Sequence, residues 1–136
     1  MATPFVFPVS VYYEDTDHSG VVYHANYLKY FERAREHVLG REELTRMYRE
    51  EGLGFVVYKA EMTFHEGAVF GDELEVRTTI DVESPYRAVF HQAVWKPDGK
   101  KPMVDSHIQL VCVEGTKLVP LPEQVMARAR ATGAVD

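Results

Sequence analysis

The chain has 136 residues, a formal net charge of −6 at neutral pH and a single cysteine. This length predicts one domain, spanning residues 1–136, that buries about two-thirds of the surface exposed by the unfolded chain. The acidic balance argues against a nucleic-acid-binding protein, which needs a basic face, and one cysteine excludes a disulfide framework or a cysteine-rich metal site. Cys112 lies in an apolar run and is interpreted as a buried structural thiol.

The first predicted elements are one strand and one long helix. Residues 1–8 contain two prolines, so pairing in a central strand is not expected before Val9, and a first strand is predicted from Val9 to about Tyr13. Apolar residues then recur at three- and four-residue steps, which predicts a helix of roughly four turns that ends at Gly40. The stripe consists of Tyr27, Tyr30, Phe31, Ala34 and Val38.

A second, shorter helix is predicted over residues 41–51. Charges occupy most of its positions, so we interpret it as a solvated connector that packs through Leu44 and Met47. Gly52 and Gly54 close it.

From Phe55 onward the apolar period changes from helical to two, which predicts strands. In the first of them one apolar face is expected, formed by Val56, Tyr58, Ala60, Met62 and Phe64. Further strands are predicted over residues 72–82, 87–96 and 103–114, joined by turns, and Pro122 opens a C-terminal helix to about Arg130.

This order of elements predicts an α+β fold. Consecutive strands joined by short turns form antiparallel sheets, and a long helix with a wide apolar stripe needs a sheet face to cover it. The expected architecture is a curved antiparallel sheet of about five strands wrapped around one long central helix.

The segment between the first strand and the long helix is the candidate catalytic site. Asp17 lies in a turn with Gly20 and should sit close to the start of the helix. The unpaired N–H groups of a helix N-terminus can hold an oxyanion while a nearby carboxylate acts on the same carbon. Asp17 could instead be an ordinary turn residue, and His24 could be satisfied by a backbone carbonyl. A metal site formed by Asp15, Asp17, His18 and His24 is a weaker alternative, because their spacing matches no established zinc or calcium pattern.

The run from Tyr13 to Tyr27, YEDTDHSGVVYHANY, resembles the signature of hot-dog-fold acyl-CoA thioesterases of the 4-hydroxybenzoyl-CoA thioesterase type. The resemblance is strongest to the bacterial branch associated with the Tol-Pal envelope system. It implies a hot-dog fold in which Asp17 is the catalytic carboxylate, as nucleophile or as general base for water. It also implies that a backbone N–H near Tyr23 and His24 polarises the thioester oxygen, that His24 assists and that Tyr13 lies near the acyl site.

The same resemblance implies how substrate and partner are bound. Two copies would pair edge to edge into a homodimer, often doubled into a homotetramer, with active sites at the interface. Residues Val57, Tyr58 and Lys59 would then reach the partner's site, and Arg87 with Tyr86 beside it would hold the CoA phosphates. The 4-hydroxybenzoyl-CoA enzyme has more basic residues at the turn that corresponds to residues 84–88 of this chain.

The predicted function is hydrolysis of an acyl-CoA to a carboxylic acid and free CoA, with no metal or other cofactor. A hot-dog hydratase or dehydratase would use similar proton-transfer groups. A non-hydrolytic acyl-CoA or acyl-carrier-protein binding module is the main alternative, and a protein-interaction role would leave a large apolar surface patch. The sequence has no run of roughly 20 apolar residues and no leader-like N-terminus, so a cytoplasmic protein without membrane insertion is expected.

Overall fold

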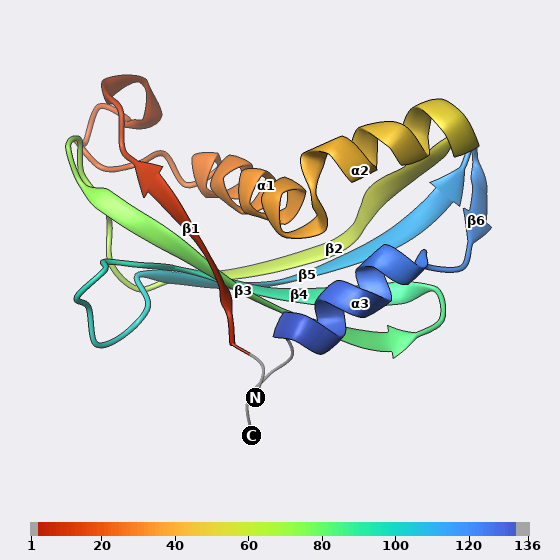
Figure 1. Cartoon of the computed structure of the whole chain (residues 1–136). Helices are drawn as coiled ribbons and strands as arrows, with labels where there is room; N and C mark the ends of the chain where they lie inside the picture. Colours follow the sequence, from red (N-terminus) through yellow and green to blue (C-terminus); the bar gives the residue numbers. More distant parts are fainter. Residues whose placement is uncertain (1–2, 133–136) are drawn as a thin grey trace.

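The computed structural model describes residues 3–132 and contains a curved antiparallel sheet with helices packed on it (Figure 1). Along the sheet the strands follow the order β1-β3-β4-β5-β2, and a short strand β6 also pairs with β5. The predicted α+β architecture is confirmed, with β6 as an addition to the expected strands. In chain order the elements are β1 (Phe5–Ser10), η1 (Tyr13–Asp15), α1 (Asn26–Leu39), α2 (Arg41–Arg46), η2 (Met47–Glu51), β2 (Leu53–Phe64), β3 (Glu73–Ser84), β4 (Arg87–Trp95), β5 (Val104–Glu114), β6 (Lys117–Val119) and α3 (Glu123–Thr132).

Helix α1 lies across the concave face of the sheet and supplies one side of the core (Figure 1). All five residues of the predicted stripe are buried, and Phe31 and Ala34 have no exposed surface. They pack against the inward-facing residues of β3, β4 and β5, including Val76, Phe90 and Ile108. The long helix and its buried face are therefore confirmed, and so is the burial of Cys112.

The first strand differs from the prediction. It runs from Phe5 to Ser10 rather than from Val9 to Tyr13, and Pro8 lies inside it opposite Glu75 of β3. A proline is tolerated there because β1 is an edge strand, where one side of the backbone has no partner strand. Tyr13 instead begins the 3₁₀ turn η1. Met1 and Ala2 of the predicted entry segment lie outside the described residues.

The alternation expected for β2 is wrong in its first half. The register against β5 shifts between Val57 and Lys59, so that Tyr58 occupies a β-bulge. Side chains alternate between the two faces of a strand, so one extra residue moves every side chain after it to the opposite face. Leu53 and Phe55 before the bulge therefore pack on the core together with Met62 after it, while Val56 and Tyr58 are exposed.

The remaining helices cover the ends of the sheet. The predicted second helix is divided into α2 and a π-helical turn, η2. Leu44 packs against the core, and Met47 is buried. Helix α3 packs on β3 and against α1 (Figure 1). Among residues 3–132, no helix is long and apolar enough to cross a membrane.

We expect Gly40→Ala to lower the free energy of unfolding by about 1–3 kcal/mol. Gly40 ends α1 with φ 94° and ψ 109°, a conformation that strains any residue with a Cβ atom. Urea unfolding of the wild type and of Gly40→Ala, at equal protein concentration, measures the difference in the free energy of unfolding. Gly54→Ala is the control, because a Cβ there meets no atom within 4 Å and φ is not positive; equal stabilities of the two variants would contradict the prediction.

Candidate active site

Asp17 lies in a tight hairpin-like loop between η1 and α1. The N–H of Asp17 donates to the carbonyl oxygen of Val21 at 2.8 Å, and the N–H of Gly20 donates to that of Asp17 at 3.0 Å. Gly20 has φ 86°, which the turn requires and which glycine adopts without strain. Thr16 and Val22 pair across the base of the loop. The position of Asp17 is therefore fixed by backbone bonds on both sides.

The segment after β2 holds this loop against the body of the protein. The N–H of Val22 donates to the carbonyl oxygen of Ala68 at 2.9 Å, and the N–H of Ala68 donates to the Tyr27 hydroxyl at 3.3 Å. A Cβ atom added to Gly67 would lie 3.0 Å from Cγ1 of Val21, so a glycine permits this close approach. The loop, α1 and the segment 67–69 thus form one packed unit.

Asp17 and His24 line a common groove of about 340 Å³. Oδ1 of Asp17 accepts a hydrogen bond from the N–H of Ser19 at 2.8 Å, so one carboxylate oxygen has the turn role considered above. Among residues 3–132, Oδ2 of Asp17 has no hydrogen-bond donor, which leaves it available to a substrate. The other lining residues are Val21, Val22, Tyr27, Phe64, His65, Glu66 and Gly67.

The start of α1 provides backbone N–H groups beside this groove. The N–H of Tyr23 is already used, because it donates to the carbonyl oxygen of Asp15 at 2.9 Å. Within the described part of the chain, the N–H groups of His24 and Ala25 have no acceptor. The family resemblance places the N–H that polarises the thioester oxygen near Tyr23 and His24. The amide of His24, unlike that of Tyr23, is free to bind that oxygen.

Asp15 is the anchor of the motif. Its Oδ2 accepts hydrogen bonds from the N–H of Tyr12 and from the Tyr30 hydroxyl, both at 2.9 Å. Its carbonyl oxygen also accepts from Nδ2 of Asn26 at 2.9 Å. Burial, followed by the bond to Asp15, raises the pKa of Tyr30 above its ordinary value, so this hydroxyl stays a donor at neutral pH. The carboxylate of Asp15 thereby connects η1 to the first turns of α1.

Aromatic rings form one wall of the groove. The His24 ring lies 4.5 Å from the Tyr23 ring and 6.3 Å from that of Phe64, measured between centroids. The Tyr27 ring is 5.9 Å from Phe64, and burial raises the pKa of the Tyr27 hydroxyl. Such contacts favour one orientation of the His24 ring, although His24 itself is exposed.

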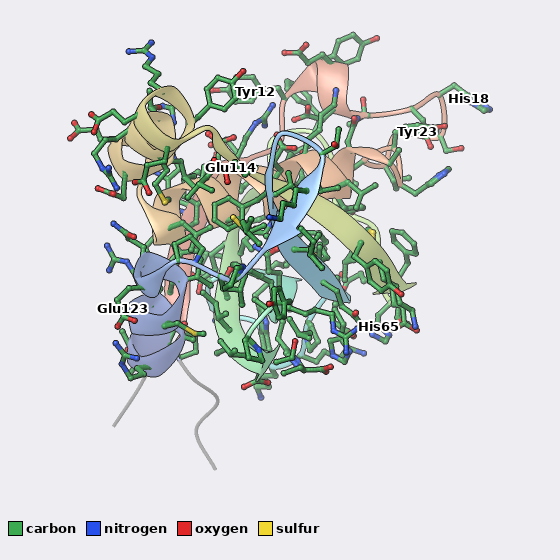
Figure 2. The ribbon with its side chains drawn as sticks, turned by 90° about the vertical axis from the view of Figure 1, so that its right-hand side faces the viewer. Tyr12, His18, Tyr23, His65, Glu114 and Glu123 are labelled. Carbon is green, nitrogen blue, oxygen red and sulfur yellow. The ribbon has the colours of Figure 1, made fainter. Side chains whose placement is uncertain are left out.

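Tyr13 is not among the residues that line the groove. Its side chain is 78% exposed, and its ring meets the edge of the Phe70 ring at 6.0 Å. Figure 2 shows His18 and Tyr23 at the upper right of the view, on the loop before α1, and Glu123 of α3 on the opposite side of the molecule. The loop that carries the motif therefore forms one corner of the molecule.

The predicted CoA-binding residues form a separate cluster. The Arg87 guanidinium lies 6.0 Å from the Tyr58 ring and pairs with Glu83, Nη2 to Oε2, at 3.3 Å. Nε of Arg87 is buried and has no acceptor among residues 3–132. Tyr86 beside it is 44% exposed. The structure brings Tyr58 and Arg87 together but does not place them in the Asp17 groove of the same chain.

The other two predicted contact residues lie on either side of the bulge in β2. Val57 lines a second groove, at the opposite end of α1 from Asp17, and Lys59 pairs with Glu61 at 3.7 Å. Both residues precede Phe64 on the same strand β2, by seven and five positions, and neither lines the Asp17 groove of the same copy.

Other histidines contact neighbouring side chains, and the His107 ring lies 4.1 Å from that of His91. His65 pairs with Asp105 at 2.7 Å, His91 with Asp81 at 3.5 Å, and His37 stacks on Phe7. Within residues 3–132, no group of three or more His, Cys, Asp or Glu side chains is arranged to hold a metal ion.

Sequence reasoning did not identify Phe64, Gly67 and Ala68 as part of this site. Phe64 occupies an ordinary apolar strand position, and Gly67 and Ala68 follow it in a connecting segment. They reach the Asp17 loop only through contacts across about 40 residues of chain, which no local pattern reports.

Residues 11–129 match the family model of the thioesterase-like superfamily. A protein of Helicobacter pylori named acyl-CoA thioesterase YbgC is 50% identical over 127 residues, covering 93% of this chain and 82% of the relative. The acyl-CoA thioester hydrolase YbgC of Escherichia coli is 35% identical over 128 residues, covering 92% and 95%. The crystal structure of a 1,4-dihydroxy-2-naphthoyl-CoA thioesterase from Synechocystis superposes with a TM-score of 0.84 at 25% identity, covering 93% and 96%.

Proposed function

The chain belongs to the thioesterase-like superfamily, and we propose that it is an acyl-CoA thioester hydrolase in which Asp17 acts on the thioester carbon. The family resemblance carried by residues 13–27 and the hot-dog fold are thereby confirmed. The observation that carries the proposal is the common groove of Asp17 and His24 at the start of α1. We also propose that residues 1–136 form one domain, which acts in the cytoplasm without a cofactor.

The proposed mechanism uses one carboxylate oxygen and one or two amides. The thioester oxygen accepts hydrogen bonds from the N–H of His24 and of Ala25, which stabilise the negative charge that develops on it. A well-placed donor of this kind contributes about 3–4 kcal/mol to transition-state stabilisation. Oδ2 of Asp17 attacks the carbonyl carbon or removes a proton from the attacking water. The C–S bond then breaks, and CoA leaves as a thiolate that takes up the proton removed from the water or, in the nucleophilic route, a proton from solvent. In the nucleophilic route a water molecule then hydrolyses the Asp17–acyl anhydride, which releases the acid and restores the carboxylate.

His24 and Tyr13 are assigned supporting roles. The His24 ring, held by Tyr23 and Phe64, can orient the thioester or the attacking water beside Asp17. The exposed Tyr13 ring would approach the acyl site only when a substrate or a second copy covers the motif loop. Tyr23 contributes to the substrate site through its stacking on His24.

Tyr58, Tyr86 and Arg87 are proposed to bind the CoA moiety. A guanidinium near an aromatic ring, as Arg87 is near Tyr58, can pair with a phosphate while the ring supports a stacked base. The buried Nε of Arg87 without an acceptor supports this assignment, because a phosphate oxygen would satisfy it.

We further propose a homodimer formed through β2, which doubles into a homotetramer. Strand β2 is the free edge of the sheet, opposite β1. Large apolar side chains are exposed along it, and an unpaired edge offers N–H and C=O groups to another strand. These side chains are Val56, Val57, Tyr58 and Phe64, each between 46% and 65% exposed. Antiparallel pairing of two β2 strands about a two-fold axis would place Val57, Tyr58 and Lys59 of one copy beside the Phe64 end of the other.

The proposed function is tested by free-thiol release from short-chain, long-chain and hydroxybenzoyl-CoA, with the assembly measured by light scattering. We expect thiol release with at least one class, and a particle of at least two chains. Tight binding of an acyl-CoA without thiol release would instead support the binding module. A monomer that turns over would contradict the assembly alone.

A further inference from the structure

Two histidines lie side by side on the face of the sheet that points away from α1. Side chains alternate along a strand, and His91 stands between two buried residues of β4, so it points outward. His107 stands likewise between two buried residues of β5. Both line a groove of about 320 Å³ on this outer face. Arg77 also lines the groove, and its charge is paired with Glu75 at 2.8 Å.

His91 and His107 are direct neighbours across β4 and β5. They are register partners in the antiparallel ladder, which places their Cβ atoms about 4.5–5.5 Å apart. Their ring centroids are 4.1 Å apart, and the ring planes are inclined by 52°. A divalent ion that binds two imidazoles with bonds of about 2.0–2.1 Å holds the two nitrogens about 3.0–3.4 Å apart. The two rings are therefore close enough for one ion to bind both.

A carboxylate of the neighbouring strand stands at ligand spacing beside this pair. Oδ2 of Asp81 on β3 lies 3.5 Å from Nε2 of His91. This separation is too long for a strong hydrogen bond. It is close to the distance of about 3.4 Å between two ligand atoms on one tetrahedral ion. His91 and Asp81 thus already hold two ligand atoms at the spacing that a metal ion requires.

Of the carboxylates around the histidine pair, Asp81 is the one available to a cation. Glu61, opposite the pair on β2, is paired with Lys59 at 3.7 Å. Asp105, which lies on β5 and lines the same groove, is paired with His65 at 2.7 Å. Among residues 3–132, Asp81 has no basic partner besides the histidine pair.

The histidines must be neutral to bind a metal ion. Burial, followed by the nearby His107, lowers the pKa of His91, while Asp81 acts in the opposite direction. The net effect is a lowered pKa, so the His91 ring is mostly neutral at pH 7 and has a free lone pair.

One side-chain rotation completes the site. As the side chains of residues 3–132 stand, three ligand atoms do not meet around one point. His107 is exposed, and rotation about the bond to a histidine ring is broad, so this ring can turn toward His91 and Asp81. A water molecule would take the fourth position of a tetrahedral ion.

We propose that His91, His107 and Asp81 bind one divalent transition-metal ion per chain on the outer face of the sheet. Two imidazoles with one carboxylate suit Zn²⁺, Cu²⁺ or Ni²⁺, whereas Mg²⁺ and Ca²⁺ prefer oxygen ligands. The ion is structural: it joins β3, β4 and β5 and stabilises the folded sheet. The inference does not depend on the proposed function, because none of the three residues lines the Asp17 groove.

Calorimetric titration of the chelator-treated full chain with ZnCl₂ at neutral pH tests the site. We expect saturable binding of about one ion per chain, and no binding of MgCl₂ at the same concentrations. His91→Gln and His107→Gln are each expected to weaken zinc binding by at least about tenfold, and Asp81→Asn by about tenfold. The matched control is His37→Gln, because His37 is exposed on α1 and stacks on Phe7; its affinity should stay within about twofold of the wild type.

A second measurement on the wild type does not depend on the folding of any variant. In NMR spectra, zinc should shift the ring signals of His91 and His107 and leave those of His37 unchanged. Saturating zinc should also raise the Tm by about 5–10 °C, and His91→Gln should lose this rise. A wild type without saturable binding, an unchanged affinity in any of the three site variants, or an equal loss in His37→Gln would show an adventitious ion only and overturn the inference.

Discussion

Asp17→Asn is expected to lower kcat for thiol release by about 10²- to 10⁴-fold, the usual contribution of a positioned base. The amide can still accept the hydrogen bond from the N–H of Ser19 through its Oδ1, so the loop is expected to keep its shape. It cannot attack carbon or take a proton from water at neutral pH. A steady-state assay of thiol release, with the best substrate of the panel, measures the loss.

Glu14→Gln is the matched control for this prediction. It makes the same change from carboxylate to amide three residues earlier, on a residue outside the Asp17 groove. We expect its kcat to stay within about twofold of the wild type. Wild-type turnover by Asp17→Asn would refute the assignment, and equal losses in both variants would point to a general effect of charge rather than to Asp17.

The two chemical routes open to Asp17 leave different isotope labels. As nucleophile, it forms a mixed anhydride with the acyl group, which water then hydrolyses, so that repeated turnover in H₂¹⁸O can place ¹⁸O in the Asp17 side chain. As general base, it never bonds to the acyl carbon, and ¹⁸O enters only the released acid. ¹⁸O found by mass spectrometry in the peptide containing Asp17 therefore establishes the nucleophilic route, whereas label confined to the acid fits the general base and also an anhydride that water opens at the acyl carbon.

Local patterns predicted the long helix and the turn that contains Asp17 for a physical reason. The stripe from Tyr27 to Val38 has helical spacing and is buried, and Gly40 ends the helix in a conformation that favours glycine. Both signals lie within a few residues of the feature they report. The extent of β1 was missed because the tolerance for Pro8 depends on the position of the strand at the sheet edge, which is a property of the whole topology.

Long-range contacts account for what sequence reasoning missed at the site. The bulge at Tyr58 is defined only by its register against β5, and it reverses which side chains of β2 face the core. The amide of Tyr23 is used by Asp15, which the motif itself does not reveal. Arg35 has the sequence context of a solvated helical charge, between Glu32 and Glu36, yet it is buried because its face of α1 points toward Gln92.

Phe31→Ala is expected to lower the free energy of unfolding by about 3–5 kcal/mol, because it opens a cavity between α1 and the sheet. Phe31 is fully buried, and its carbonyl oxygen also accepts the hydrogen bond that fixes Gln92. Urea unfolding at equal protein concentration measures the change, since a dimer's stability depends on concentration. Lys29→Ala, on the exposed side of the same helix, should change the value by less than about 0.5 kcal/mol. Similar losses in both variants would contradict the placement of α1 in the core.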